Sequence, residues 1–523
     1  MDILTSPTFI ASASLGALAV YYLAGSQKRG SRHPPGPRRL PVIGNAHQMP
    51  DKDPWLVFGE WGKQYGNIIH VDVFGQSLII INSTKVAKDL LDKRSSIYSD
   101  RPHFKFAGDL YAHPPIVILM NIMIVTIGMP SEFTTTKHLF SSHMARIGEN
   151  SASMVPRYFS LQDKESARLV RNLIKDPSKF ISEVNLRIGI IILRVTYGYY
   201  VESADDPFLT TPLLAMANFG KATQPGNFLV DFVPACGQRE RNLTMESAVK
   251  HIPRWMPGAG FLKTAEEMHK VMWSATWNNY EWCKNNLEAG ENITEDDELK
   301  LGWAASSVMG GGLDTNVSSV MMFWAAMILN PQIQAKAQAE LDSVVGKDRL
   351  PTISDRPRLP YIRSIMAEVF RMGPSIPLGQ FITCAVFANA DKVHPPGIPH
   401  AVSEDDVYEG YHIPKGAFIL PNVWHMLHDP EVYPDPMEFK PERFNGSESE
   451  MKKATDRTLF AIIATTLATC HILPGLDEHG KEVLPKFAYT PGTITFLEPF
   501  PMRLKARSPD AVSLLENVPS DVE

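Results

Sequence analysis

Residues 301–330, LGWAASSVMGGGLDTNVSSVMMFWAAMILN, contain one charged side chain, that of Asp314, and Pro331 follows them. A helix of this length with so little charge is typical of a protein core or of a membrane span. An Asp near the middle costs about 2.5–3.5 kcal/mol on membrane insertion, so we predict a buried core helix. Thr294 and Asp297 form a capping-box-like start just before it.

Three consecutive glycines, Gly310 to Gly312, lie in the middle of this stretch. Each costs about 1 kcal/mol relative to Ala in a helix interior, so the run needs a reason. Close helix packing is one reason. Another reason is a flat patch of backbone, or a locally opened hydrogen-bond ladder, that admits a planar cofactor or a substrate. Asp314 and Thr315 would then supply a carboxylate and a hydroxyl that pass protons to a bound ligand, although a Thr in mid-helix often bonds the carbonyl four residues earlier.

Two shorter motifs follow along the chain. Glu368 and Arg371 stand three residues apart on a helix that we expect to begin near Pro360. The same spacing is common in surface pairs worth about 0.2–0.5 kcal/mol. The second motif is Pro-Glu-Arg-Phe at residues 441–444, which contains Arg443.

The N-terminal stretch from Thr8 to Gly25 is mostly apolar, and a helix of that length reaches about 30 Å, the thickness of a bilayer core. Only Asp2 precedes it, whereas Lys28 and Arg32 follow it. A signal peptide has the opposite order of charges, so we predict an uncleaved anchor with the main body on the cytosolic side.

The composition of the 523 residues, with 44% hydrophobic and 21% charged residues and a net charge of −6, is that of a globular protein. Nucleic-acid binding is not expected, because it requires clustered Lys and Arg. A disulfide framework and a zinc site are also not expected, because the four cysteines are scattered and form no CxxC pair. They are Cys236, Cys283, Cys384 and Cys470.

A β-hairpin is predicted between residues 67 and 81, where two β-rich runs flank Gly75. Before it, residues 34–41 read Pro-Pro-Gly-Pro-Arg-Arg-Leu-Pro, and prolines at this density stiffen the chain. The stretch from Lys137 to Lys284 is mostly helical in pattern and contains no repeat of solenoid period.

The order of these motifs resembles the cytochrome P-450 superfamily, particularly its microsomal and fungal members. The resemblance implies a mainly α fold with a minor β region on the N-terminal side, behind an N-terminal membrane helix. It also implies a haem-dependent monooxygenase that inserts one oxygen atom from O2 into a lipophilic small molecule. An NADPH-dependent reductase on the same membrane, the endoplasmic reticulum, would supply electrons.

On this basis the chain divides into four parts. We predict a membrane anchor over residues 1–27, a proline-rich hinge over 28–50, a cytochrome P-450 catalytic domain over 51–507 and a C-terminal tail over 508–523.

Catalytic and haem-binding residues also follow from the resemblance. Asp314 and Thr315 match the acid and the alcohol that deliver protons. Gly311 and Gly312 match the place where the helix opens over haem. Lys137 matches the one remaining cation of a pair that binds a haem propionate.

The resemblance gives three further residues a structural role. Glu368, Arg371 and Arg443 match a buried ion network that locks the core behind the haem. No residue is assigned as a metal ligand.

The family's strongest motif is absent from its expected place. A Phe-x-x-Gly-x-Arg-x-Cys-x-Gly loop, whose thiolate ligates the haem iron, should follow Phe444. Here a polar run over residues 445–457 leads directly into residues 459–469, which match the helix after that loop. Cys470 lies at the far end of this helix, where a buried Cys is usually inert packing.

Residues 114–130 and 380–396 also depart from the family pattern, the first by replacement and the second by insertion. Three such changes resemble a misassembled coding sequence.

Two functional alternatives to the monooxygenase remain open. One is a haem-free relic that binds apolar ligands or a partner. The other is an isomerase or dehydratase that keeps haem, against which the Asp314–Thr315 pair argues.

Overall fold

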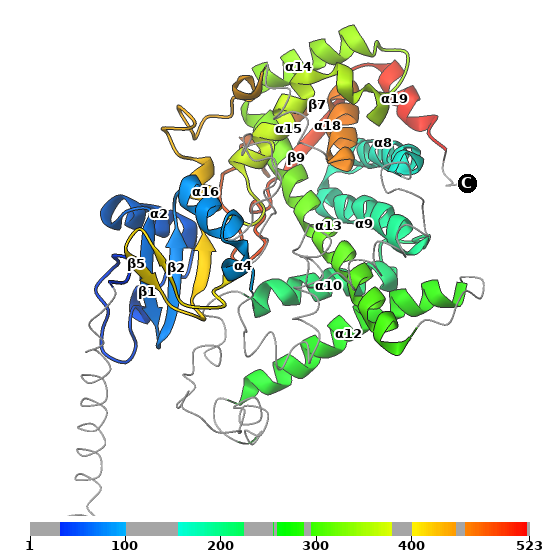
Figure 1. Ribbon diagram of the computed structural model, residues 1–523. Helices are drawn as coiled ribbons and strands as arrows, with labels where there is room; N and C mark the ends of the chain where they lie inside the picture. Colours follow the sequence, from blue (N-terminus) through cyan, green and yellow to red (C-terminus); the bar gives the residue numbers. More distant parts are fainter. Residues whose placement is uncertain are drawn as a thin grey trace, which may run out of the picture. The chain divides into compact units, whose positions relative to one another are not determined.

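The computed structural model of the chain describes residues 32–100, 155–223, 255, 259–286, 294–378, 400–445 and 456–519 (Figure 1). They fall into two compact units. The first unit contains residues 32–100 and 400–421, and the second contains the other described residues. The predicted anchor over residues 1–27 lies outside the described residues, and the predicted domain limits stay predictions.

The first unit is built on a four-stranded sheet with the order β1-β2-β6-β3. β1 (Ile68–Val73) and β2 (Gln76–Ile81) form the hairpin that the sequence predicts, and Gly75 provides the positive φ of +88° that its turn requires. β6 (Phe418–Pro421) runs parallel to β2, and β3 (His400–Ala401) runs antiparallel to β6. Segments far apart in the sequence therefore share this sheet.

A short hairpin of β4 (Asp406–Tyr408) and β5 (Tyr411–Ile413) belongs to the same unit. The Asp406 carboxylate accepts hydrogen bonds from Arg94 Nη1 at 2.6 Å and from the Tyr98 hydroxyl at 2.8 Å, which hold this hairpin against the N-terminal part of the unit. The unit also contains the helices α2 (Pro54–Tyr65), α3 (Thr84–Ala87) and α4 (Ser95–Tyr98).

The second unit is organised around α13 (Glu295–Leu329), the long green helix of Figure 1. All residues from Val317 to Ile328 are buried, so this part of the helix is covered on every side. α13 packs against α9 (Phe180–Tyr197) and α18 (Arg457–Thr469), and α8 (Phe159–Lys175) packs against both of these. The four helices form one apolar core.

The sequence prediction of a core helix is therefore confirmed. In the described part of the chain, Leu301–Leu329 is the one helix long and apolar enough to cross a membrane, and 72% of its most apolar window is buried inside the protein. Its uncharged character follows from this packing, because an unpaired charge in a dry core is costly.

A second sheet, of order β8-β7-β9, lies near the C-terminal end of the sequence. The expectation of a β region only on the N-terminal side is therefore incomplete. β7 forms a local hairpin with β8 and pairs on its other side with β9, about thirty residues later. The unit contains the following further elements: α10 (Pro207–Ala222), α12 (Gly260–Asn286), α14 (Pro331–Val344), α15 (Pro360–Met372), α16 (Val423–Leu427), α19 (Pro509–Glu516), β7 (Cys470–Leu476), β8 (Glu482–Val483) and β9 (Met502–Ala506).

Candidate functional site

The glycine run lies where two other helices, α10 and α9, contact α13. A Cβ atom at Gly310 would stand 2.6 Å from the Met216 sulfur of α10, and one at Gly312 would stand 3.0 Å from Ile192 Cδ1 of α9. Both contacts are tighter than carbon atoms normally allow. Close helix packing therefore accounts for these two glycines, and α13 continues as an α-helix through them.

The turn from Gly311 to Asn316 is less covered than the residues of α13 directly before and after it. Five of the six residues from Gly311 to Asn316 are half-buried, and Leu313 alone is fully buried. The Thr315 hydroxyl donates to the Gly311 carbonyl at 2.7 Å, and Asn316 Nδ2 donates to the Gly312 carbonyl at 2.6 Å. Side chains of this turn therefore bond the backbone of the preceding turn, a pattern that weakens and bends helices.

Asp314 is the one carboxyl group in this segment. Burial raises the pKa of Asp314 to about 7. The cause is the loss of hydration that the charged form needs. Its carboxyl group therefore exchanges a proton near neutral pH, which is the property required of a proton relay.

Three polar residues that the sequence did not reveal lie beside Thr315. Ser375 Oγ donates to the Thr315 carbonyl at 3.3 Å, Thr495 N–H donates to the Ser375 carbonyl at 2.7 Å, and Ser318 Oγ donates to the Thr495 carbonyl at 2.9 Å. These bonds bring two distant irregular segments alongside α13. No local pattern in the sequence could have found them, because each contact joins positions at least 60 residues apart.

Glu368 and Arg371 of α15 form a bidentate ion pair in the core. Arg371 Nε donates to Glu368 Oε2 at 2.7 Å, and Arg371 Nη2 donates to Glu368 Oε1 at 2.8 Å. Both side chains are 0% exposed. Arg371 Nη1 also donates to the Leu427 carbonyl at 3.0 Å. A surface pair, the alternative that the spacing allowed, is excluded by this burial.

Arg443 completes the group from the Pro-Glu-Arg-Phe segment, which forms a 3₁₀ turn. Its Nε stands 3.4 Å from Glu368 Oε1, and its Nη2 donates to the Asp435 carbonyl at 2.6 Å. The Lys440 backbone N–H donates to the same Glu368 oxygen at 2.8 Å. The structure therefore brings together the three residues predicted to form an ion network, and it adds backbone partners that only the tertiary fold reveals.

The start of α18 contains no sulfur ligand. Asp456 caps this helix by accepting a hydrogen bond from the Leu459 N–H at 2.8 Å. Cys470 follows the last residue of the same helix, about 20 Å further along its axis. It is 0% exposed and pairs with Ala506 in the β7–β9 ladder. Burial raises the pKa of the Cys470 thiol to about 11, so it stays protonated.

The remaining cysteines offer no alternative among the described residues. Cys283 lies on α12, where burial raises the pKa of its thiol. Cys236, Cys384 and the predicted haem-binding Lys137 lie outside the described residues. The described part of the chain also contains no group of three or more His, Cys, Asp or Glu side chains placed to hold a metal ion.

The two sides of a haem site therefore differ in this chain. The half-buried turn at Gly311–Asn316 and the Asp314 carboxyl suit the side where a ligand reacts. The resemblance also requires a thiolate in the segment before α18, and in the described part of that segment Asp456 caps the helix. The described residues do not fit a haem held by a cysteine thiolate.

Comparison with known families gives an independent result. The sequence profile of the family described as Cytochrome P450 matches residues 34–120, 280–385 and 392–459. The first match ends inside the replaced segment 114–130. The break between the second and third matches falls inside the inserted segment 380–396. The last match ends at the start of α18.

Two fungal proteins illustrate the similarity. Cytochrome P450 monooxygenase 105 of Postia placenta is 43% identical over 527 positions, which take in 94% of this chain and 92% of that protein. Cytochrome P450 monooxygenase claR of Ampulloclitocybe clavipes is 34% identical, over 98% of this chain and 93% of that protein. The first alignment is longer than this chain of 523 residues. That relative therefore has residues without a counterpart here.

The fold has a solved counterpart as well. A zebra fish cytochrome P450, whose structure was determined with progesterone, superimposes with a TM-score of 0.63 at 20% identity, over 87% of this chain and 99% of that one. This likeness concerns the fold alone, whereas the fungal identities extend over nearly the whole sequence. The chain therefore belongs to the cytochrome P450 family.

Proposed function

We propose that the function inherited with this fold is the reaction of the relatives, the insertion of one oxygen atom from O2 into a lipophilic small molecule, and that the chain performs it only with the cysteine loop restored. Haem is the cofactor of this family, and the two fungal relatives described above are named as monooxygenases. The observation that carries the proposal is the 43% identity to a fungal monooxygenase across 94% of the chain. Electrons would come from an NADPH-dependent reductase, and the second oxygen atom would leave as water.

Two structural features of α13 also support this proposal. The Asp314 carboxyl has a pKa of about 7, so it takes up and releases protons at physiological pH. The Thr315 hydroxyl, on the next residue, is held by the Gly311 carbonyl at 2.7 Å. Both groups belong to the same half-buried turn, and the proposal assigns to them the transfer of protons to a bound ligand.

A haem-free relic is the second candidate function, and the start of α18 is the observation that favours it. The position that should follow a cysteine loop is occupied by Asp456, which caps the helix. The buried thiol of Cys470 at the other end stays protonated. A chain without an axial thiolate would retain the fold but lose the oxygen chemistry that the thiolate supports.

A misassembled coding sequence would explain how an otherwise well-matched chain lacks this loop. The first match to the family profile ends inside segment 114–130, and the second and third matches are separated inside segment 380–396. We expect the messenger RNA of the source organism to lack the codons for residues 380–396 and to encode Phe-x-x-Gly-x-Arg-x-Cys-x-Gly after Phe444. A transcript identical to the present sequence at both junctions would remove this explanation and leave the relic.

Haem binding by two proteins, the chain itself and a chimera, separates the two functions. In the chimera, residues 446–455 are replaced by the cysteine loop of the 43% identical relative. We expect the chain to bind no haem through thiolate and the chimera to give the red-shifted absorption of a reduced, carbon-monoxide-treated thiolate haem. A thiolate spectrum from the unaltered chain would exclude the relic. A chimera that folds but binds no haem would overturn the monooxygenase proposal.

A membrane location is part of the same proposal. The apolar stretch over residues 8–25, followed by cations, supports a single anchor with the catalytic body in the cytosol, at the endoplasmic reticulum. The proline-rich segment that follows would hold the body close to that membrane, from which a lipophilic substrate and a reductase are both accessible.

A further inference from the structure

Residues 32–39, at the start of the proline-rich run, are bound to the first unit through their backbone. The His70 N–H of β1 donates to the Pro35 carbonyl at 3.0 Å, and the His412 N–H of β5 donates to the Arg32 carbonyl at 2.9 Å. β1 and β5 come from distant parts of the sequence. This docked segment is therefore held at two strands, in each case by the amide of a histidine.

Three histidine rings meet where the segment docks. The His33 ring stacks on the His70 ring, with centroids 4.6 Å apart and an angle of 14° between the planes. The His33 and His412 ring centroids are 5.4 Å apart, and His33 Nδ1 donates to the His412 carbonyl at 3.3 Å. Gly36 allows this close approach, because a Cβ atom there would overlap the His70 carbonyl oxygen. His33 belongs to the docked segment, so it covers His70 only while the segment is docked.

The surroundings of His70 keep its ring in the neutral form. Burial lowers the pKa of His70 to about 3, and His33 and Arg39 act in the same direction. Its Nε2 is hydrogen-bonded to the Ser77 hydroxyl at 3.2 Å, a contact that a neutral imidazole makes either as donor or as acceptor. At mild acidity a proton can therefore be added to this ring only after the ring becomes exposed to water.

The acidic groups of the interface act on the other two histidines. Asp405 Oδ1 is 3.7 Å from His412 Nε2. Burial lowers the pKa of His33, and the positive charge of Arg39 adds to this shift, whereas the carboxylate of Asp72 opposes it. Asp72 also lies 4.0 Å from Arg39, measured from Oδ2 to Nη1. A positive charge on either of these two rings is therefore partly offset by a carboxylate.

We propose that the interface between residues 32–39 and the first unit is pH-sensitive, so that the segment stays docked while His70 is neutral and is released when His70 takes up a proton. An uncovered imidazole titrates near its ordinary pKa of about 6.5. Protons therefore favour the released state as the pH falls below about 6.5, and they have no effect on docking well above that value. At pH 5 the ratio of docked to released chain should be about thirtyfold lower than at pH 8.

Release would change the tether between the predicted anchor and the catalytic body. Residues 32–39 span about 28 Å when fully extended. Once freed from β1 and β5, they would lengthen the tether by up to this distance. The inference uses neither haem nor the proposed oxygen chemistry, so its test is independent of the test of that function.

Hydrogen exchange of backbone amides measures docking on the full-length chain in detergent micelles. The His70 and His412 amides are bonded to the docked segment. Ile79 and Ile80 are controls, because they are 0% exposed and lie in β2, which is paired on both sides. Mass spectrometry with fragmentation to single residues gives each protection factor relative to an unstructured peptide at the same pH. From pH 8 to pH 5, protection of the His70 and His412 amides should fall at least tenfold and that of the controls less than threefold.

Three variants show whether the His70 ring is the group that responds. Gly36→Ala should remove the protection of both amides already at pH 8, because it prevents docking. His70→Phe keeps a flat ring under His33 but cannot take up a proton, so protection of the His412 amide should stay within twofold between pH 8 and pH 5. His47→Phe, at an exposed histidine of the same unit, should respond as the parent does.

Three outcomes would overturn the proposal. The first is full protection of the His70 and His412 amides in the parent at pH 5. The second is an equal loss at these amides and at the two controls, which would indicate unfolding of the whole sheet. The third is a His70→Phe chain whose control amides stay protected while the His412 amide still loses protection as strongly as in the parent.

Discussion

Asn279 of α12 donates a hydrogen bond from Nδ2 to the backbone carbonyl of Phe208 in α10, over 3.2 Å. Pro212 lies four residues after Phe208 inside the same helix and has no N–H, so α10 cannot supply the usual helical donor itself. Asn279 is 2% exposed. A buried side chain of one helix thus replaces the backbone bond that the proline removes from another.

A double-mutant cycle tests this replacement. Asn279→Ala should lower the free energy of unfolding by about 1–3 kcal/mol, because it leaves the part-buried Phe208 carbonyl without this donor. The same change should cost clearly less in a Pro212→Ala background, where the restored N–H at position 212 bonds Phe208. Urea unfolding followed by circular dichroism gives the four values. Equal losses in both backgrounds would show that the amide serves another purpose.

Removal of the Glu368 charge, the buried partner of Arg371, should be the most destabilising substitution in the second unit. Glu368→Gln leaves Arg371, which is 0% exposed, without a counter-charge. Loss of one partner of a buried pair costs about 3–5 kcal/mol. We expect a correspondingly lower free energy of unfolding, or loss of folded protein in expression, measured by urea unfolding and by soluble yield after detergent extraction.

Glu60→Gln is the matched control for this experiment. Glu60 pairs with Lys63 at the same spacing of three residues, at 2.7 Å, but the two side chains are 70% and 67% exposed. An exposed pair of this kind contributes about 0–1 kcal/mol. Similar effects of the two substitutions would contradict a special role of the buried pair.

The pH dependence of stability should depend on Asp314. Its pKa is raised to about 7 in the folded protein, whereas an Asp in an unfolded chain titrates near 4. Between these pH values the folded state binds the proton more strongly, so the contribution of Asp314 to stability falls as pH rises from about 4 to 7 and is then constant.

Asp314→Asn removes this titration. The variant should gain stability relative to the parent as pH rises through that window, by up to about 4 kcal/mol. Urea unfolding of both proteins at several pH values from 4 to 8 measures the difference, in which all other titrating groups cancel. A difference that does not change with pH would mean that the carboxyl group is hydrated.

Cys470 should behave as a structural thiol. Since burial holds its pKa at about 11 and its side chain is 0% exposed, we expect iodoacetamide to label it at least tenfold more slowly in the folded chain than in urea. Peptide mass spectrometry resolves it from the other cysteines. Rapid labelling of the native protein, or a haem spectrum that disappears in Cys470→Ala, would show that this thiol is available as a ligand.

The predicted anchor makes a simple fractionation prediction. Full-length protein should sediment with membranes in ultracentrifugation, because residues 8–25 are long enough to span a bilayer core. Deletion of residues 1–27 should release much of it while leaving the hinge and the body intact. Recovery of the full-length chain in the supernatant would exclude an anchor.

The parts of the fold that the sequence predicted are those with a strong local pattern. The absence of charge identified α13 as a core helix, the β-rich runs around Gly75 identified the first hairpin, and the motif that contains Glu368 was correctly placed on a helix from Pro360. In each case the sequence pattern that predicts the element extends over no more than about thirty residues, and burial or turn geometry explains that pattern directly.

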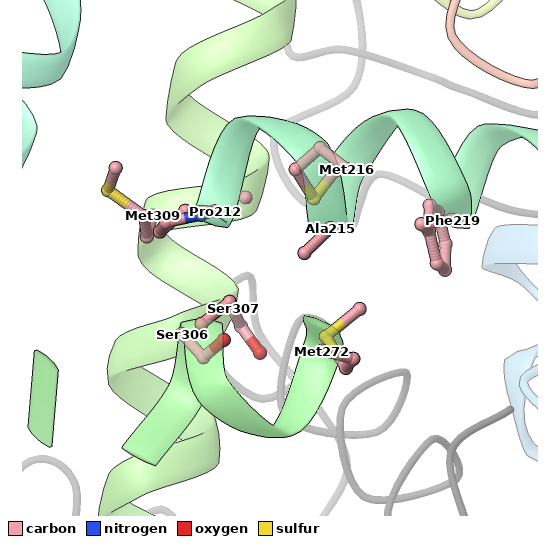
Figure 2. Close-up of a pocket in the computed structure, with 10 residues that line it drawn as sticks. Pro212, Ala215, Met216, Phe219, Met272, Ser306, Ser307 and Met309 are labelled. Atoms are coloured by element: carbon pink, nitrogen blue, oxygen red, sulfur yellow. The ribbon is translucent and has the colours of Figure 1, made fainter. Parts of the chain in front are cut away.

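The features that escaped prediction all depend on contacts between distant segments. Three features require the packed helices and cannot be read from the sequence of one of them. They are the hydrogen bond of Ser375 with Thr315, the donor that Asn279 provides to α10, and the pocket between α10, α12 and α13 (Figure 2). The glycine run shows the same limit, because its sequence allowed both close packing and a cofactor patch. Only the positions of Met216 and Ile192 identified packing at two of the glycines.

The parallel pairing of β2 with β6 has a consequence for synthesis of the chain. Gln76, at the start of β2, contacts Gly416, 340 residues later. At about 5–20 residues per second, a ribosome needs about 20–70 s to reach the second strand after making the first. For that time the apolar Leu78–Ile81 segment has an unpaired edge, which is a template for aggregation. Production of this protein should therefore respond to chaperone supply and to slower growth at low temperature.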